Sequence, residues 1–177
     1  MRAVVSYRID QDDSIAALGD DWVSFAIAND ATHLADVTGR SLWDFVSDST
    51  TRQVYRQLLA RVRQGRTIRF SYRCDAPSLK RFMQMTMSPA PAGGVTFESA
   101  TVRTEPCGTT SALPEAGPDH LLRMCGWCKR VAVDGQWEEV ECAVERSGVF
   151  AGRPPAITHT MCPSCLQTMD DTAAIAV

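Results

Sequence analysis

The sequence predicts an α+β protein: an antiparallel sheet with helices on one face, followed by a small C-terminal module organised by four cysteines. Three observations predict it. Between residues 67 and 102, apolar and polar residues alternate with a period of two, which is typical of strands covered on one face. Residues 49–64 place apolar residues at helical spacing. Two Cys-x-x-Cys pairs lie near the end of the chain.

The composition is that of a folded protein with an ordinary core. The chain has 177 residues, of which 45% are apolar, and a net charge of −3. There is no apolar run of ~18 residues that would span a membrane, and residues 1–8 lack the apolar core of a secretory signal. We therefore expect a cytoplasmic protein. No phosphate-binding glycine loop or Gly-x-Ser-x-Gly elbow is present, so we expect no enzymatic activity.

The first region is expected to begin with a strand over residues 3–9 and a second apolar stretch at 15–18. A helix ending near residue 28 follows, with Asp20 or Asp21 as its cap. Residues 39–46 read as a turn into a short helical segment.

A longer helix is predicted from a cap at Ser49 or Thr50 to Gln64, with Gly65 as its stop signal. Val54, Leu58 and Val62 lie four residues apart and indicate one buried face. Three strands should follow, at residues 67–74, 81–87 and 95–102.

Residues 105–118 have the composition of a linker, with three prolines, two glycines and almost no large apolar residue. This divides the chain into a region at 1–104 and a module at 119–177, which we expect to be separable.

The strongest motif is the pair of Cys-x-x-Cys turns, whose cysteines are Cys125, Cys128, Cys162 and Cys165. Each turn directs two sulfurs at one centre, and two turns complete a tetrahedral thiolate site of the kind that binds structural zinc. The Asp134-Gly135 dipeptide predicts a tight hairpin between the pairs. Pro163 suits the first turn of a helix running to about Asp170.

Other interpretations of the cysteines remain open. Disulfides or a thiol redox pair would use the same residues, although no βαβ unit of the redox type is visible. An iron site of the rubredoxin type is a further option. Rubredoxins place glycine after each pair, whereas Lys129 and Leu166 stand there in this chain. His159 could replace one cysteine as a ligand.

Residues 1–104 resemble the PAS sensory domain. The residues that carry the resemblance are Tyr7-Arg8-Ile9-Asp10, the turn at 39–45, the long helix and the three final strands. Residues 125–130, 137–141 and 159–165 resemble the cysteine-rich tail that follows some bacterial PAS domains. The tail is accordingly expected to be a small zinc-ribbon-like module.

The PAS resemblance implies a sensor that holds a ligand or a signal-sensitive core between sheet and helices. Candidate lining residues are Trp22, Phe25, Trp43, Phe45, Tyr55, Phe70, Tyr72, Met83, Met85 and Met87. The alternative is that these side chains simply form the core. The flavin-binding motif of this family is absent, and the long helix lacks the histidine of its haem sensors. His33, the one histidine before residue 105, is expected on a loop.

The sequence thus favours a non-catalytic signalling protein that acts through protein–protein contacts. The outer sheet face around Phe82 is expected to dock either a second copy of the chain or the zinc module. A DNA-binding regulator and a thiol redox protein are the alternatives. Residues 119–177 carry 5 Lys and Arg against 8 Asp and Glu, which disfavours nucleic acid. The arginines between residues 61 and 73 form either a solvated face or a contact for acidic groups, including those of the chain's own tail.

Overall fold

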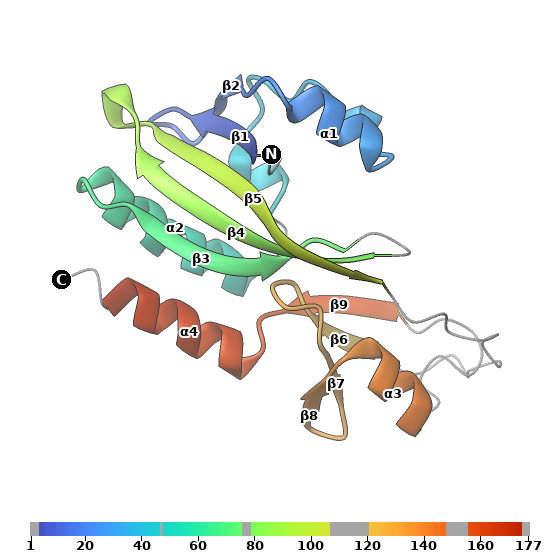
Figure 1. Ribbon diagram of the computed structural model, residues 1–177. Coiled ribbons are helices and arrows are strands. Elements are labelled where there is room, and N and C mark those ends of the chain that lie inside the picture. The colour runs from blue at the N-terminus through green and yellow to red at the C-terminus, as the bar shows by residue number, and fades with distance from the viewer. Residues whose placement is uncertain (1–3, 47, 76–78, 107–120, 148–155, 175–177) are drawn as a thin grey trace.

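The computed structural model describes residues 4–46, 48–75, 79–106, 121–147 and 156–174. Within these residues the chain forms a mixed α+β structure with two sheets and four α-helices (Figure 1). The α+β class is therefore confirmed. Of the predicted linker, Glu105 and Pro106 continue a strand, and the remainder lies outside the described residues.

The first region contains a five-stranded antiparallel sheet in the order β2-β1-β5-β4-β3. Its strands are β1 (Val4–Ile9), β2 (Ile15–Leu18), β3 (Ile68–Arg73), β4 (Leu79–Pro89) and β5 (Val95–Pro106). Its helical segments are α1 (Trp22–Ala28), η1 (Thr32–Leu34), η2 (Leu42–Asp44), α2 (Ser49–Arg63) and η3 (Pro91–Gly93). All predicted elements of this region are present, although β4 and β5 run longer than expected.

The period-two pattern sets which face of this sheet is buried. Ile68 and Phe70 on β3 and Met85 and Met87 on β4 are buried, while the residues between them are polar or exposed. Helix α2 packs on β4 and β5 and buries Leu58, among others, against this apolar face.

Helix α2 begins one residue earlier than the sequence suggested. The cap is Asp48, whose carboxylate accepts a hydrogen bond from the Thr51 amide at 2.6 Å, and not Ser49 or Thr50. Asp48 has the extended backbone that a cap requires, whereas Ser49 is already helical. Gly65 ends the helix region as predicted, with a φ of +96°.

The C-terminal module has a four-stranded sheet in the order β8-β7-β6-β9, in which β6 and β9 are parallel. The predicted hairpin turns at Asp134 and Gly135, with φ values of +49° and +80°. Strands β6 and β9 and helix α3 were not anticipated. The elements are β6 (Leu121–Cys125), β7 (Val131–Val133), β8 (Gln136–Glu138), α3 (Val140–Ser147), β9 (Ala156–Thr160) and α4 (Pro163–Ala174).

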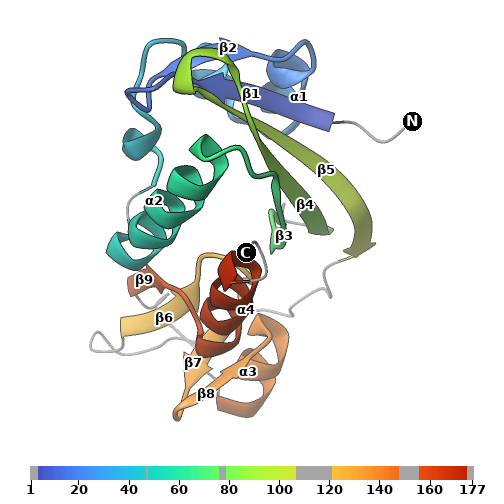
Figure 2. The same cartoon turned by 90° about the vertical axis from the view of Figure 1, so that its left-hand side faces the viewer.

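The module packs against the first region. Helix α4 lies beside α2 and β3, as Figures 1 and 2 show from two directions. Trp127, Met161 and Met169 of the module belong to the same cluster of buried side chains as Phe70 and Met85 of the sheet. The two parts therefore share one hydrophobic core.

Candidate metal centre

The first cysteine pair sits in a tight turn that leaves strand β6. The Cys125 amide donates to the Arg130 carbonyl at 2.7 Å, and the Lys129 amide donates to the Cys125 carbonyl at 3.0 Å. Lys129 has a φ of +64°, which closes the turn in the left-handed region. The Cys128 amide is then 3.5 Å from the Cys125 sulfur.

The second pair opens helix α4. Cys162 immediately precedes the helix, and Pro163 occupies its first position. The Cys165 amide donates to the Cys162 sulfur at 3.4 Å. Parallel pairing of β6 with β9 brings the two turns together, and the Gly126 amide bonds the Thr160 carbonyl at 2.8 Å.

All four cysteine sulfurs lie within 4.8 Å of one another. The sulfurs of Cys128 and Cys162 are 3.7 Å apart, whereas Zn–S bonds of ~2.3 Å in a tetrahedron place sulfurs roughly 3.8 Å apart. Cys125 and Cys162 are buried and the other two are half-buried. The predicted cysteines are thus gathered in an arrangement that fits a four-thiolate metal site.

The electrostatics of the cluster suit a bound cation. Hydrogen bonds from the Cys128 and Cys165 thiols, with backbone amides of Cys128 and Cys162, lower the pKa of Cys125 far below its usual range. The pKa of Cys128 rises to about 11, first because its thiol donates to Cys125. A metal ion would remove this competition by stabilising all the thiolates together. No disulfide joins any of the cysteines in the described part of the chain.

The absence of glycine after the first cysteine pair is no argument against an iron site of the rubredoxin type. Rubredoxin-type turns use glycine after the pair, and Lys129 stands at that position with the left-handed φ for which glycine is favoured. The first pair therefore adopts the same kind of turn without glycine, whereas after the second pair Leu166 lies within α4 and has no left-handed backbone. The thiolate set fits a metal, and zinc remains our proposal for its identity.

Trp127 anchors the turn formed by residues 125–128, which we call the metal turn, to the edge of the first sheet. Its side chain is only 7% exposed, and its ring centroid lies 5.0 Å from Phe70 and 5.8 Å from Tyr55. The indole nitrogen donates to the Ser71 carbonyl at 3.0 Å. In return, the Arg73 amide donates to the Trp127 carbonyl at 2.8 Å. The residue between two candidate ligands is thereby paired with strand β3.

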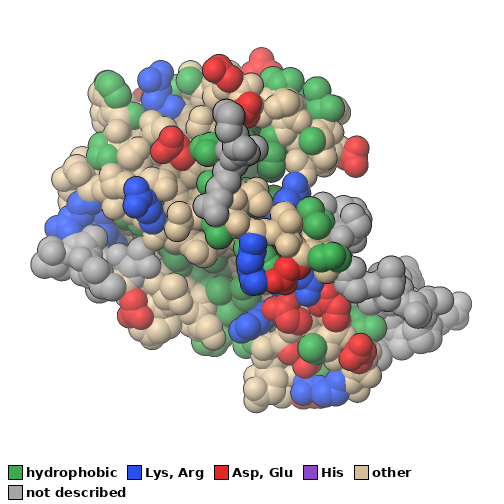
Figure 3. All heavy atoms as spheres, viewed as in Figure 1, with side chains coloured by type: hydrophobic (Ala, Val, Ile, Leu, Met, Phe, Trp, Pro, Cys, Tyr) green, Lys and Arg blue, Asp and Glu red, His purple; other side chains and the backbone are tan. Residues whose placement is uncertain are grey.

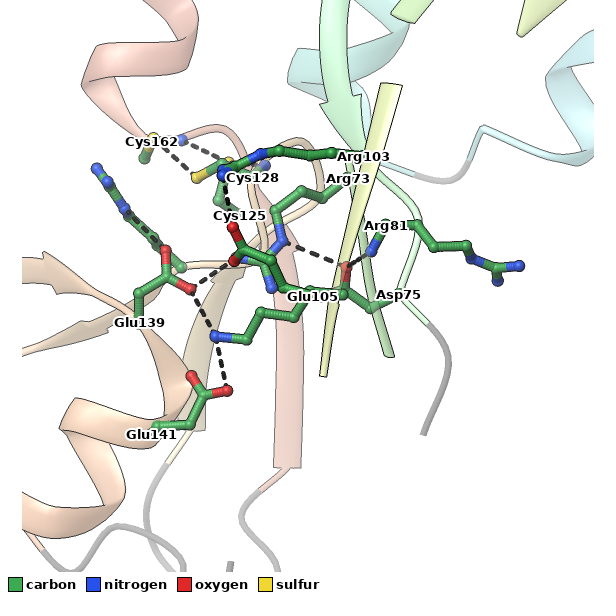
Figure 4. A network of polar contacts seen from close by, with 12 residues as sticks. Arg73, Asp75, Arg81, Arg103, Glu105, Cys125, Cys128, Glu139, Glu141 and Cys162 are labelled. Carbon is green, nitrogen blue, oxygen red and sulfur yellow. Dashed lines mark hydrogen bonds and ion pairs between the residues drawn. The ribbon is translucent and has the colours of Figure 1, made fainter. Parts of the chain in front are cut away.

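An ion-pair network reinforces the same junction (Figure 4). Arg73 is buried and contacts Asp75 at 2.5 Å and Glu139 of the module at 2.6 Å. Lys80 contacts Glu139 at 3.5 Å and Glu141 at 2.7 Å. Figure 3 shows acidic and basic side chains gathered where the module meets the first region. Among the described residues, Arg73 is the arginine of the stretch that pairs with the module, while Arg63 pairs with Asp13 of the first region at 2.7 Å.

The acidic partners of Arg73 and Lys80 in the module show what sequence reasoning missed. Glu139 and Glu141 were not singled out, and their spacing carries no signal of the contact. Partial burial would raise the pKa of Glu139, but its hydrogen bond to Arg73 and the nearby positive charges outweigh this and lower it. The carboxylate is therefore charged in the folded protein.

The predicted pocket residues do not line a single cavity. Trp22 and Phe45 line a cavity of about 180 Å³. Phe45 also lines a groove of about 300 Å³ with Tyr55 and Tyr72, and Tyr72 and Met83 line another of about 360 Å³. The rest lie elsewhere: Phe70, Met85 and Met87 are buried in the core, Trp43 bonds Asp13 at 2.9 Å, and the Phe25 ring faces Arg81.

The histidines and Phe82 have other surroundings. His159 is an exposed residue of β9 that lines the groove of about 300 Å³, and the set of four sulfurs is complete without it. His33 is exposed on η1. Phe82 lies beneath the guanidinium groups of Arg103 and Arg73, at 3.7 and 5.5 Å from its ring centroid.

Comparisons with known proteins add no family. No protein-family profile matches the sequence, and no curated protein matches it at a significant level. Within the residues that the structure describes, no helix has the length and apolar character needed to cross a membrane.

Proposed function

We propose that the protein is a non-catalytic cytoplasmic regulator in which a PAS-like sensory unit is coupled to a zinc-stabilised module that acts through protein–protein contacts. The PAS-like part of the proposal rests on the order of elements, two strands, short helices, one long helix and three strands, and on the sheet order β2-β1-β5-β4-β3. The zinc-ribbon-like part rests on the two cysteine turns and the hairpin between them.

One observation carries the coupling. Trp127 lies between Cys125 and Cys128, and both its indole and its carbonyl hydrogen-bond with strand β3. A shift of the sheet edge therefore moves the metal turn, and loss of the metal releases the sheet edge. Four thiolates leave no open coordination position, so the site suits structure and signal transmission better than catalysis.

Metal analysis and hydrogen exchange test this proposal together. Protein purified without chelator should contain one zinc per chain, and Cys162→Ala should lose it. Cys142 is exposed on α3, outside the cluster, so Cys142→Ala is the matched control and should keep the metal. On metal removal, amide exchange should accelerate along β3 as well as in the module, because the Arg73 amide loses its acceptor.

The contrary outcomes distinguish the alternatives. Metal-free protein with the four thiols oxidised would favour a thiol redox protein. Salt-dependent retention on DNA would favour a DNA-binding regulator. Exchange along β3 that does not change on metal removal would show that the module transmits nothing to the sheet.

A further inference from the structure

A groove of about 300 Å³ lies where the start of α2, strand β3 and the metal turn meet. Its walls come from both parts of the chain. The first region contributes Phe45, Val46, Asp48, Thr51, Tyr55 and Tyr72, and the module contributes Gly126, Trp127 and His159. The groove is therefore complete only when the module is docked, and its volume is at the lower end for small-molecule sites.

The Tyr55 hydroxyl has no hydrogen-bond partner among the described residues. Burial, with a smaller effect from Tyr72, raises the pKa of Tyr55, so the phenol stays protonated and can donate. No fully enclosed polar side-chain atom is left unpaired among those residues, so the Tyr55 oxygen keeps some accessible surface. Because Tyr55 lines the groove, a molecule in the groove can accept its hydrogen bond.

The neighbouring walls define the chemistry of such a molecule. Four aromatic residues, Phe45, Tyr55, Tyr72 and Trp127, line the groove and favour a flat aromatic ligand through contacts between rings. The Tyr72 hydroxyl already pairs with Ser99 at 2.8 Å, so Tyr55 is the tyrosine of the groove whose hydroxyl is available as a donor, beside Thr51 and His159 on the same walls. A donor between aromatic walls fits an acceptor oxygen on a ring.

We propose that this groove binds a small, uncharged planar aromatic molecule carrying a carbonyl oxygen, which accepts a hydrogen bond from Tyr55. This inference rests on the proposed function and names the ligand class of its sensory unit. Since Trp127 forms one wall, ligand binding and docking of the metal module stabilise each other, as linkage requires. Binding of an aromatic ligand therefore affects the module through Trp127, the residue that anchors the module to β3.

The test compares two probes with one ring system. Indole-3-carbaldehyde carries the carbonyl, and 3-methylindole lacks it; dissociation constants are measured by calorimetry on the metal-loaded full chain. One net hydrogen bond predicts that the aldehyde binds roughly 3- to 10-fold more tightly. Tyr55→Phe removes only the hydroxyl and should abolish this preference.

Tyr7→Phe is the matched control. Tyr7 is half-buried like Tyr55, and its hydroxyl has no partner in the described part of the chain, but it lines the separate cavity of about 180 Å³. The preference for the aldehyde should survive in this variant. Metal removal by chelator should weaken binding of both probes, because the Trp127 wall is lost.

Two results would overturn the inference. One is that neither probe binds the metal-loaded protein, and the other is that the preference for the aldehyde persists in Tyr55→Phe. If the metal is bound and β3 still responds to its removal, either result leaves the proposed function standing and removes only the ligand site.

Discussion

Replacement of Trp127 by alanine should destabilise the whole protein and not only the metal module. Trp127 contacts Phe70 and Tyr55 of the first region and donates to the Ser71 carbonyl. The alanine variant would leave a cavity in the core that both parts share. The metal ligands themselves would be unchanged.

The size of the effect follows from the burial of the side chain. Truncation of a buried aromatic residue to alanine costs about 3–5 kcal/mol of unfolding free energy, and Trp127 is only 7% exposed. Trp127→Phe keeps a ring against Phe70 but loses the indole hydrogen bond and part of the buried area. We expect that variant to lose about 1–2 kcal/mol.

Urea unfolding at saturating zinc, followed by circular dichroism and by tryptophan fluorescence, measures these differences. The metal content of each variant is determined in parallel, so that loss of zinc is not mistaken for loss of packing. Trp137→Ala is the control, because Trp137 lies in the same module on β8 but is only half-buried, and it should lose less. A shared core further predicts one cooperative transition for the parent protein.

A loss below about 1 kcal/mol in metal-loaded Trp127→Ala would refute the reasoning, since it lies outside the range for a buried aromatic side chain. Two separate transitions in the parent protein would refute the shared core as well. They would instead support the sequence-based prediction that residues 1–104 fold independently of the module, which stays a prediction until this experiment is done.

Three further predictions concern a cap, a turn and an ion pair. Asp48→Ala should lose about 1 kcal/mol of unfolding free energy, because the cap of α2 is removed, while Ser49→Ala should change little; equal effects would contradict the cap assignment. Lys129→Gly should keep the metal and raise the unfolding free energy by up to about 1 kcal/mol, because glycine relieves the left-handed φ; metal loss would contradict this. The pKa of Glu139 is lowered in the folded state. Its pairing with Arg73 therefore stabilises the protein fully at pH values above the unfolded carboxyl pKa of about 4.3. This stabilisation is lost as the pH falls through the lower pKa of the folded state. Acid titration of stability should therefore be shallower for Glu139→Gln than for the parent, and identical curves would show that the pair does not contribute.

Local sequence patterns were enough to predict most of the helices and strands in the first region. Alternation located β3, β4 and β5, and helical spacing located α2, because these periods are properties of neighbouring residues. The cap of α2 was misplaced by one residue, since Asp48, Ser49 and Thr50 are all able to cap a helix and the backbone at each position decides between them. Strand β9 was missed because its parallel partner, β6, is distant in sequence.

The sequence by itself determined the α+β class, the principal elements of the sheet region, the hairpin at Asp134-Gly135 and the set of four cysteines. Each of these depends on the identity and spacing of residues close together in the chain. Only the tertiary structure decided that Trp127 enters the core beside Phe70, that Arg73 is buried against Glu139, and that Tyr55 opens onto a groove with a wall from the module. These contacts join residues far apart in the chain, and they form because the core buries more apolar surface when the module docks on β3. The spacing of neighbouring residues does not indicate that the module docks on β3. The junction between the metal site, the sheet and the groove is therefore visible only in the folded protein.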